Sequence, residues 1–164
     1  MQIIGAGRDK TFIQGGGFDI QGKKEKGKKV ELKDMTIYEA SGSGVYSDNG
    51  LSWLCDSLTI TQCGNNGVKA QNTKGRLINC VITQCKYSGI FCLKSALIEL
   101  EGSQTKVDGN VTSGNSYYYG LHTYHSPSSI INLLFPLTKE SVSTNNAGGG
   151  NYGGAGTIET IDSF

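Results

Sequence analysis

The sequence predicts an all-β protein in which a single chain winds into a coil of short parallel strands. Three observations lead to this prediction. A nine-residue pattern recurs at nearly constant spacing, apolar and polar residues alternate within each copy, and no stretch carries the 3.6-residue spacing of an amphipathic helix. A fixed period of this kind is typical of repeat architectures, in which each unit buries its apolar face against its neighbours.

The repeat is clearest in the sequence Ile-Thr-Gln-Cys, which occurs at 60–63 and again at 82–85. In both copies a glycine and a β-branched residue follow the cysteine at the same distance, and an earlier segment, 37–45, has the same frame. The frame is I-x-x-[A/C]-x-x-x-G-[V/I], and it recurs after 60 − 37 = 23 and 82 − 60 = 22 residues.

The alternation within each copy indicates strands. Met35-Thr36-Ile37 and Val68-Lys69-Ala70 are examples, and the residues between such segments are mainly Gly, Asn, Ser and Asp, which suit tight turns. Short strands at this period predict a right-handed parallel β-helix. Each turn of the coil forms one rung, and equivalent residues of successive rungs stack in columns about 4.8 Å apart.

The predicted columns are consistent along the coil. Six columns are predicted to point inward, and nearly all their members are apolar or small: Leu32/Cys55/Leu77, Met35/Leu58/Cys80, Ile37/Ile60/Ile82, Ala40/Cys63/Cys85, Val45/Val68/Ile90 and Ser47/Ala70/Cys92. Two are predicted to point outward and are polar: Tyr38/Thr61/Thr83 and Glu39/Gln62/Gln84. A single register therefore accounts for three successive repeats.

The frame resembles the parallel β-helix repeats of the pectin-lyase-like superfamily. The resemblance is close over residues 30–95 and looser on both sides. Downstream, the frame holds if Asn110 and Gly120 occupy the positions of Cys85 and Gly89. That step is 120 − 110 = 10 residues against 89 − 85 = 4, so the rung should carry 10 − 4 = 6 extra residues.

The length suits one domain of about six rungs. The predicted rungs are 2–20, 30–50, 51–75, 76–95, 96–126 and 130–146, which together give a β-helix over 1–146. The remaining segment, 147–164, has six glycines between residues 148 and 156 and is predicted to be a C-terminal cap or assembly arm. We expect it to cover apolar side chains of the last rung such as Leu133 and Phe135, because open strand edges are templates for pairing.

Composition excludes several classes of protein. The net charge is +1, which gives no general attraction to nucleic acid or to an anionic membrane, and no run of about 18 apolar residues spans a bilayer. The N-terminus does not resemble a signal peptide. The five cysteines all fall in inward columns and are predicted to be free core thiols, which favours a reducing compartment or an intracellularly assembled particle. The alternative is a disulfide between the stacked Cys63 and Cys85.

The resemblance also raises the question of catalysis, since members of the superfamily include polysaccharide lyases, hydrolases and epimerases. The hydrolase motifs Asn-Thr-Asp, Gly-His-Gly and Arg-Ile-Lys are absent, and no two aspartates are adjacent. The two arginines, Arg8 and Arg76, belong to distant rungs. We therefore predict no catalytic residue, no metal site and no cofactor. If the protein is an enzyme, the resemblance implies a polysaccharide lyase or glycoside hydrolase.

The segment 116–125 is the first candidate binding site. It contains four tyrosines and both histidines, and the predicted carbohydrate-binding residues are Tyr117, Tyr118, Tyr119, His122, Tyr124 and His125. Alternation points His122 and Tyr124 outward, where aromatic rings can lie against sugar rings. The alternatives are that the tyrosines cover the side of the coil, or that the histidines bind a metal, for which a third ligand is lacking.

The segment 22–29 is the second candidate. It contains Lys23, Lys24, Lys26, Lys28 and Lys29 around Glu25. It is either a solvated loop or a contact to an acidic partner, such as a sulfated or uronate glycan. No aromatic residue is interleaved with the lysines, which argues against nucleic acid.

The function predicted from the sequence is that of a non-catalytic structural or assembly protein, such as a component of a virion or another large particle. Its protein partner, or a second copy, would bind through the C-terminal segment. The alternative is a carbohydrate-binding or polysaccharide-cleaving β-helix module.

Overall fold

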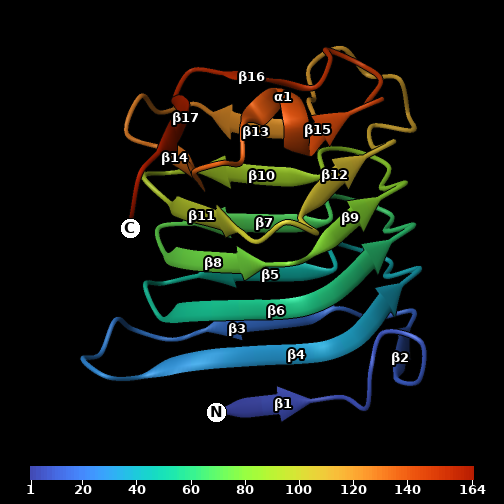
Figure 1. Ribbon diagram of the computed structural model, residues 1–164, viewed down its shortest axis with the longest axis vertical. Coiled ribbons are helices and arrows are strands. Elements are labelled where there is room, and N and C mark those ends of the chain that lie inside the picture. Colours follow the sequence, from blue (N-terminus) through green and yellow to red (C-terminus); the bar gives the residue numbers. More distant parts are fainter.

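The computed structural model describes residues 1–164 and shows a coil of parallel strands (Figure 1). The strands form two sheets that run along the coil, one with 11 strands and one with six. Each rung contributes one strand to the six-stranded sheet, so the coil has about six rungs, as the sequence predicts. The sixth of these strands is formed by residues 152–154, which lie in the segment that was predicted to be a cap or arm.

The large sheet contains β1 (Gln2–Ile4), β2 (Phe12–Gln14), β4 (Lys29–Tyr38), β6 (Ser52–Thr61), β8 (Lys74–Ile78), β9 (Val81–Thr83), β11 (Leu97–Glu101), β12 (Lys106–Asp108), β14 (Ile130–Leu134), β15 (Ser143–Thr144) and β17 (Thr157–Ile161). The six-stranded sheet contains β3 (Phe18–Gln21), β5 (Val45–Asp48), β7 (Val68–Gln71), β10 (Ile90–Leu93), β13 (Leu121–Tyr124) and β16 (Tyr152–Gly154). One helical turn, α1 (Lys139–Val142), is the only α-helix.

The predicted register is confirmed. Ile37 pairs with Ile60 and Ile60 with Ile82, while Val45 pairs with Val68 and Val68 with Ile90. These side chains are fully buried and belong to one continuous hydrophobic core of 28 residues. Burial of such apolar columns is the main stabilising contribution in a coil whose rungs contact only their neighbours.

The corners of the coil explain the second outward polar column. Glu39, Gln62 and Gln84 have φ values of 54°, 56° and 55°, so each adopts the left-handed conformation at the same corner of successive rungs. Apolar β-branched residues are strained there, whereas polar residues are better tolerated. A second corner, which divides the large sheet into two arms, uses Asp34 and Ser57 in the same way, with φ of 57° at both.

All five cysteines are buried free thiols, as the inward columns predict. Cys63 and Cys85 follow equivalent strands in adjacent rungs without a disulfide between them. Burial raises the pKa of Cys80 and of Cys92 to about 12, so these thiols stay protonated at neutral pH.

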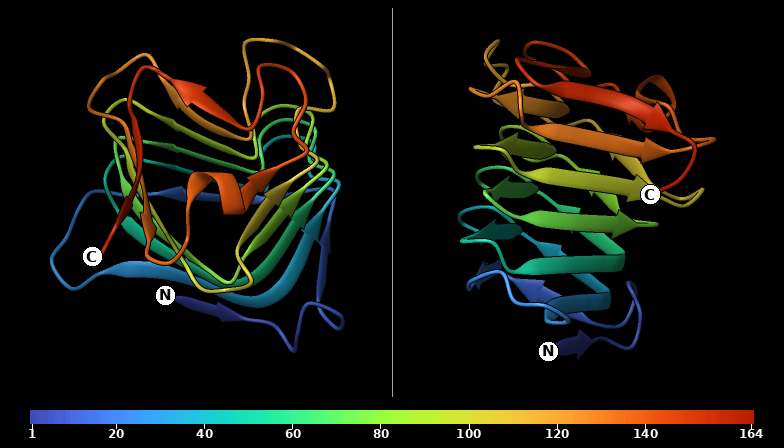
Figure 2. Two further views of the ribbon diagram at one scale, coloured as in Figure 1. Left: turned by 45° about the horizontal axis from the view of Figure 1, so that its top comes forward. Right: turned by 90° about the vertical axis from the view of Figure 1, so that its left-hand side faces the viewer.

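The predicted insertion is present. Val107 pairs with Ile82, and Leu121 pairs with Ile90. The two segments between these positions differ by (121 − 107) − (90 − 82) = 6 residues. The six extra residues lie within a loop over 111–120, here called the inserted loop, which projects beyond the outline of the other rungs (Figure 2).

The C-terminal segment 147–164 forms β16 and β17, which add a strand to each sheet. β17 pairs with β14 and leaves Leu133 fully buried. The expectation that Phe135 is also covered is wrong. Its backbone N–H donates to the carbonyl of Ile161 at 2.8 Å, but its side chain lies beyond the end of β14 and is 67% exposed.

The helical turn α1 was not expected within the sixth rung. The Thr138 side chain accepts a hydrogen bond from the backbone of Ser141, and the Ser141 hydroxyl accepts one from the Thr138 backbone, which together form a capping box. Val142 of this turn is buried against the core. The turn lies across the interior of the coil, where it covers the core near the C-terminal end (Figure 2).

No α-helix in the structure has the length and hydropathy needed to cross a membrane.

Candidate functional site

The outer face of the six-stranded sheet carries two outward columns whose composition changes from rung to rung. The first column is Asp19/Tyr46/Lys69/Phe91/His122/Gly153, and the second is Gln21/Asp48/Gln71/Leu93/Tyr124. The first rungs present polar and charged side chains, whereas β10 and β13 present aromatic and apolar ones. The face is therefore divided along the coil into a polar half and an aromatic half.

A cavity of about 550 Å³ lies over the aromatic half and is here called the aromatic groove. Its lining residues are Lys69, Phe91, Leu93, Asn115, Tyr117, Tyr118, His122 and Tyr124. Three of them, Asn115, Tyr117 and Tyr118, belong to the inserted loop, which forms one wall. Strands β7, β10 and β13 supply the rest of the lining, so the groove spans three rungs.

Phe91 lies at the centre of the aromatic contacts. Its ring centroid is 4.8 Å from His122, 5.4 Å from Tyr124 and 6.1 Å from Tyr118. Tyr118 also packs on Tyr87 of the preceding rung at 4.6 Å. Separations in this range are typical of stabilising aromatic pairs, so the rings hold one another in place without a ligand.

His122 points outward as predicted, but it is only 3% exposed because the surrounding aromatic rings cover it. Its Nδ1 lies 3.1 Å from the hydroxyl oxygen of Ser88. Burial lowers the pKa of His122 to about 4, so the ring is neutral at pH 7. Ser88 is itself fully buried and orients the histidine; its hydroxyl has no surface on which to attack a substrate.

Two of the six predicted residues support the groove from outside it. The ring of Tyr119 lies 5.1 Å from His122 and packs on Gly149 and Gly153, where a Cβ atom at either position would overlap it. His125 follows β13 with φ of 59°, and its ring packs on Tyr124 at 3.9 Å. The glycines of the C-terminal segment therefore make room for an aromatic side chain of the preceding rung.

Sequence reasoning missed four lining residues: Lys69, Phe91, Leu93 and Asn115. A signal for two of them was present. Phe91 and Leu93 occupy outward positions of β10, where the equivalent residues of β7 are Lys69 and Gln71. Apolar residues at outward positions of one rung indicate a covered or ligand-binding surface.

The lysine loop, residues 22–29, lies on another part of the molecule, between β3 and β4. Its start is attached to the next rung, because the Leu51 backbone N–H donates to the Gly22 carbonyl at 2.9 Å. Lys28 forms an ion pair with Glu25 at 2.7 Å, and Lys29 forms one with Glu31 at 2.9 Å.

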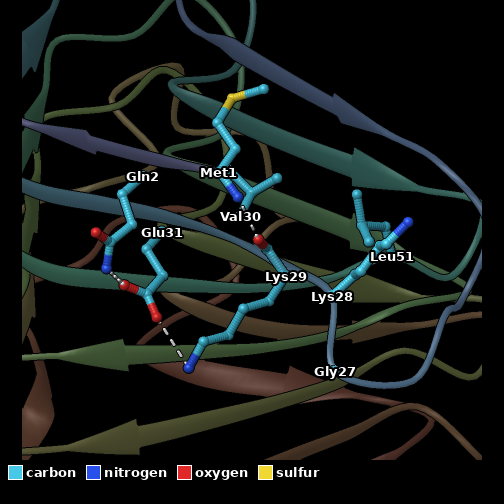
Figure 3. A pocket seen from close by; sticks show the side chains of 8 residues that line it. All are labelled: Met1, Gln2, Gly27, Lys28, Lys29, Val30, Glu31 and Leu51. Carbon is cyan, nitrogen blue, oxygen red and sulfur yellow. Dashed lines mark hydrogen bonds and ion pairs between the residues drawn. The ribbon is translucent and has the colours of Figure 1, made fainter.

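A cavity of about 370 Å³ lies beside this loop (Figure 3). In it Glu31 is held between Gln2 and Lys29, next to the apolar side chains of Met1, Val30 and Leu51. The remaining three lysines of the loop, Lys23, Lys24 and Lys26, form no ion pair within the protein. This cavity and the aromatic groove have no lining residue in common, so the structure does not bring the lysine loop and the segment 116–125 into one site.

No group of three or more His, Cys, Asp or Glu side chains is arranged to hold a metal ion. The carboxylate of Asp108 accepts hydrogen bonds from the Thr144 hydroxyl and the Asn145 amide, at 2.6 Å and 2.9 Å, which link two rungs. These bonds hold the pKa of Asp108 below its usual value. This carboxylate therefore has a structural role in joining the rungs.

The comparisons with known proteins agree with this architecture. The model of the family described as "Right handed beta helix region" matches residues 8–135, from the first rung to the residue after β14. No curated protein and no solved structure gave a match. Because the matched segment contains 135 − 8 + 1 = 128 of the 164 residues, the chain belongs to the right-handed β-helix family.

Proposed function

We propose that this β-helix is a non-catalytic protein that binds a carbohydrate chain in the aromatic groove. The observation that carries the proposal is the cluster of Phe91, Tyr118, His122 and Tyr124 around one cavity on an outer face. A fold of this kind supports many activities, so the proposal depends on the site and not on the family.

The chemistry of the groove suits sugars. The apolar C–H faces of sugar rings can lie against Phe91, Tyr118 and Tyr124, while Lys69 and Asn115 can bond the hydroxyl groups at the rim. The lining extends over three rungs, so an extended chain of several sugars fits better than a single ring. The rings are already packed on one another, which reduces the conformational entropy lost on binding.

The lining also favours binding over cleavage. Glycoside hydrolysis generally requires two carboxyl groups on opposite sides of the scissile bond, and calcium-dependent chemistry requires carboxylate ligands. The groove lining contains no Asp or Glu. Its two titratable nitrogen bases are Lys69 and the neutral His122, and neither is paired with a carboxylate.

Calorimetric titration with soluble polysaccharides tests this proposal. We expect Phe91→Ala and Tyr118→Ala each to weaken binding about tenfold, as expected for the loss of one stacking contact of about 1.4 kcal/mol. Tyr38→Ala is the matched control, since Tyr38 packs on Phe12 at the large sheet, away from the groove. Thermal melts identify any variant that fails to fold. Absence of binding by the intact protein, or equal binding by all folded variants, would overturn the proposal.

A second candidate function is assembly, as the sequence suggested, with a second copy of the chain as the partner. It is favoured by exposed apolar side chains on the first rung and by an unpaired strand edge on the last. Met1, Ile4 and Phe12 of the first rung are more than half exposed, and the outer edge of β17 has no partner strand. An unpaired parallel strand edge and exposed apolar side chains are surfaces through which copies of a β protein can associate.

Sedimentation at several protein concentrations tests this second candidate. Growing oligomers that Ile4→Lys disperses would support assembly through the first rung. A monomer at every concentration would exclude self-assembly.

A further inference from the structure

The polar half of the same outer face continues the aromatic groove along the coil. Its outward residues are Asp19 and Gln21 on β3, Tyr46 and Asp48 on β5, and Gln71 on β7. Lys69 lies at the boundary, with its Nζ 5.6 Å from the Tyr46 ring and 5.8 Å from the Phe91 ring. Since strands are only about 4.8 Å apart, a chain that leaves the groove meets the polar half at the next rung.

The side chains of the polar half are already ordered by hydrogen bonds. The Gln71 amide donates to Asp48 Oδ2 at 2.6 Å, and the Tyr46 hydroxyl is 3.4 Å from the same oxygen. One rung away, the Gln21 amide donates to Asp19 Oδ1 at 2.7 Å. Carboxylates and amides held in this way present fixed acceptors and donors, which can bond adjacent hydroxyl groups of a sugar.

The charged side chains of the polar half discriminate between acidic and neutral carbohydrates. Asp19 and Asp48 contribute two negative charges, Lys69 contributes one positive charge at the boundary, and Lys94, which directly follows β10, adds a second positive charge near Asp48. His122 is neutral at pH 7. The hydrogen bond from Gln71 holds the pKa of Asp48 below its usual value, so Asp48 stays ionised. A uronate or sulfate group placed beside either carboxylate would face a like charge, whereas uncharged hydroxyl groups would not.

We propose that the carbohydrate bound by this protein is a neutral polysaccharide whose chain runs along the coil, from the aromatic groove onto the Asp19–Asp48 surface. This inference rests on the proposed function and specifies its ligand. The aromatic half binds ring faces, and the polar half binds hydroxyl groups and rejects anionic sugars.

The test compares a neutral and an acidic polymer, mixed-linkage β-glucan and polygalacturonate, in calorimetric titrations at low salt. We expect the glucan to bind at least tenfold more tightly than polygalacturonate. Asp48→Asn should weaken glucan binding several-fold, because an amide replaces an acceptor of sugar hydroxyl groups. The double variant Asp19→Asn/Asp48→Asn should bind polygalacturonate more tightly than the wild type does. Glu159→Gln is the charge-matched control, because Glu159 is exposed on β17 of the large sheet.

Oligosaccharide length adds a second measurement. A short glucan oligosaccharide that fills only the groove should bind the wild type and Asp48→Asn equally, whereas a longer one should distinguish them. This dependence on length would not arise if Asp48→Asn merely loosened the fold.

The outcomes separate the inference from the proposed function. If polygalacturonate binds as tightly as glucan and Phe91→Ala abolishes both, the groove is a carbohydrate site and the inference of a neutral ligand is wrong. If glucan binds but the aspartate variants have no effect at any length, the chain does not cross the polar half. If neither polymer nor any other polysaccharide binds, both proposals fail.

Discussion

The inside and the outside of the same rungs follow different rules. Inside, one column reads Ile37, Ile60 and Ile82, the same residue in three successive rungs. Outside, the first column of the six-stranded sheet has a different residue in every rung, from Asp19 to Gly153. Close packing restricts the inner positions, because each side chain contacts its equivalents above and below. The outer positions lack this restriction, so they can change from rung to rung and form a binding surface without disturbing the coil.

The largest expected effect on stability comes from placing the same charged residue at an inner position and, one residue along the strand, at an outer position. Ile60→Asp places a carboxylate between Ile37 and Ile82, where no partner is available, and should lower the free energy of unfolding by about 4 kcal/mol or more. Thr61→Asp, on the outer side of the same strand, should cost less than about 1 kcal/mol. Urea denaturation measures both. Similar losses for the two variants would contradict the register.

The difference between inner and outer positions also explains how much of the structure the sequence could predict. Inner columns repeat, so a period of 22 or 23 residues was enough to place Ile60 and its neighbours. The groove could be predicted only in part. The cluster of Tyr and His at 116–125 was visible, but Phe91 became part of it only because an inserted loop folds back over the preceding rung.

Local features without a repeat were also missed. The turn α1 depends on a single capping box at Thr138, which a strand pattern does not show. The exposure of Phe135 depends on where β14 and β17 end, which the alternation of residues does not determine.

His122 is an exception to the difference between inner and outer positions, because it is an outward residue that is nevertheless buried. Measuring stability as a function of pH tests this burial. The pKa of His122 is lowered from the ordinary 6.5 to about 4, so between these values the unfolded chain binds a proton that the folded protein does not. Stability should therefore be unaffected above pH about 6.5, fall as the pH decreases, and level off below pH about 4. The total loss from this group is at most about 3 to 4 kcal/mol, because the pKa differs by 6.5 − 4 = 2.5 between the unfolded and folded states and one pKa unit corresponds to about 1.36 kcal/mol.

His122→Gln provides the control for this titration, since glutamine does not titrate and can still bond Ser88. The difference in unfolding free energy between wild type and variant should change with pH over this interval. A difference that is constant from pH 4 to pH 7 would show that the histidine is not shielded from solvent in the folded protein.

A smaller effect is expected where the C-terminal strand meets the aromatic half. Gly153→Ala would place a Cβ into the ring of Tyr119, so either the ring or β16 must move. Overpacking of this kind costs about 1–3 kcal/mol. Gly16→Ala is the matched control, because no atom lies within 4 Å of its added Cβ. Thermal melts should show a lower melting temperature for Gly153→Ala only. Equal melting temperatures would mean that the tail does not pack closely on the inserted loop.

The smallest effect on stability is expected in the lysine loop, which is outside both the inner columns and the aromatic groove. Lys23, Lys24 and Lys26 form no ion pair, so replacing all three by Gln should change the unfolding free energy by less than about 0.5 kcal/mol. If the loop contacts an acidic partner, which is one of the two interpretations of this segment, the same variant should elute from a heparin column at lower salt, because each lysine that pairs with the polymer adds to the salt dependence. Replacing Lys10, Lys86 and Lys94 by Gln removes the same charge from scattered positions and should shift elution less. Equal shifts for the two triple variants would mean that only net charge matters and that the loop is a solvated connection between β3 and β4.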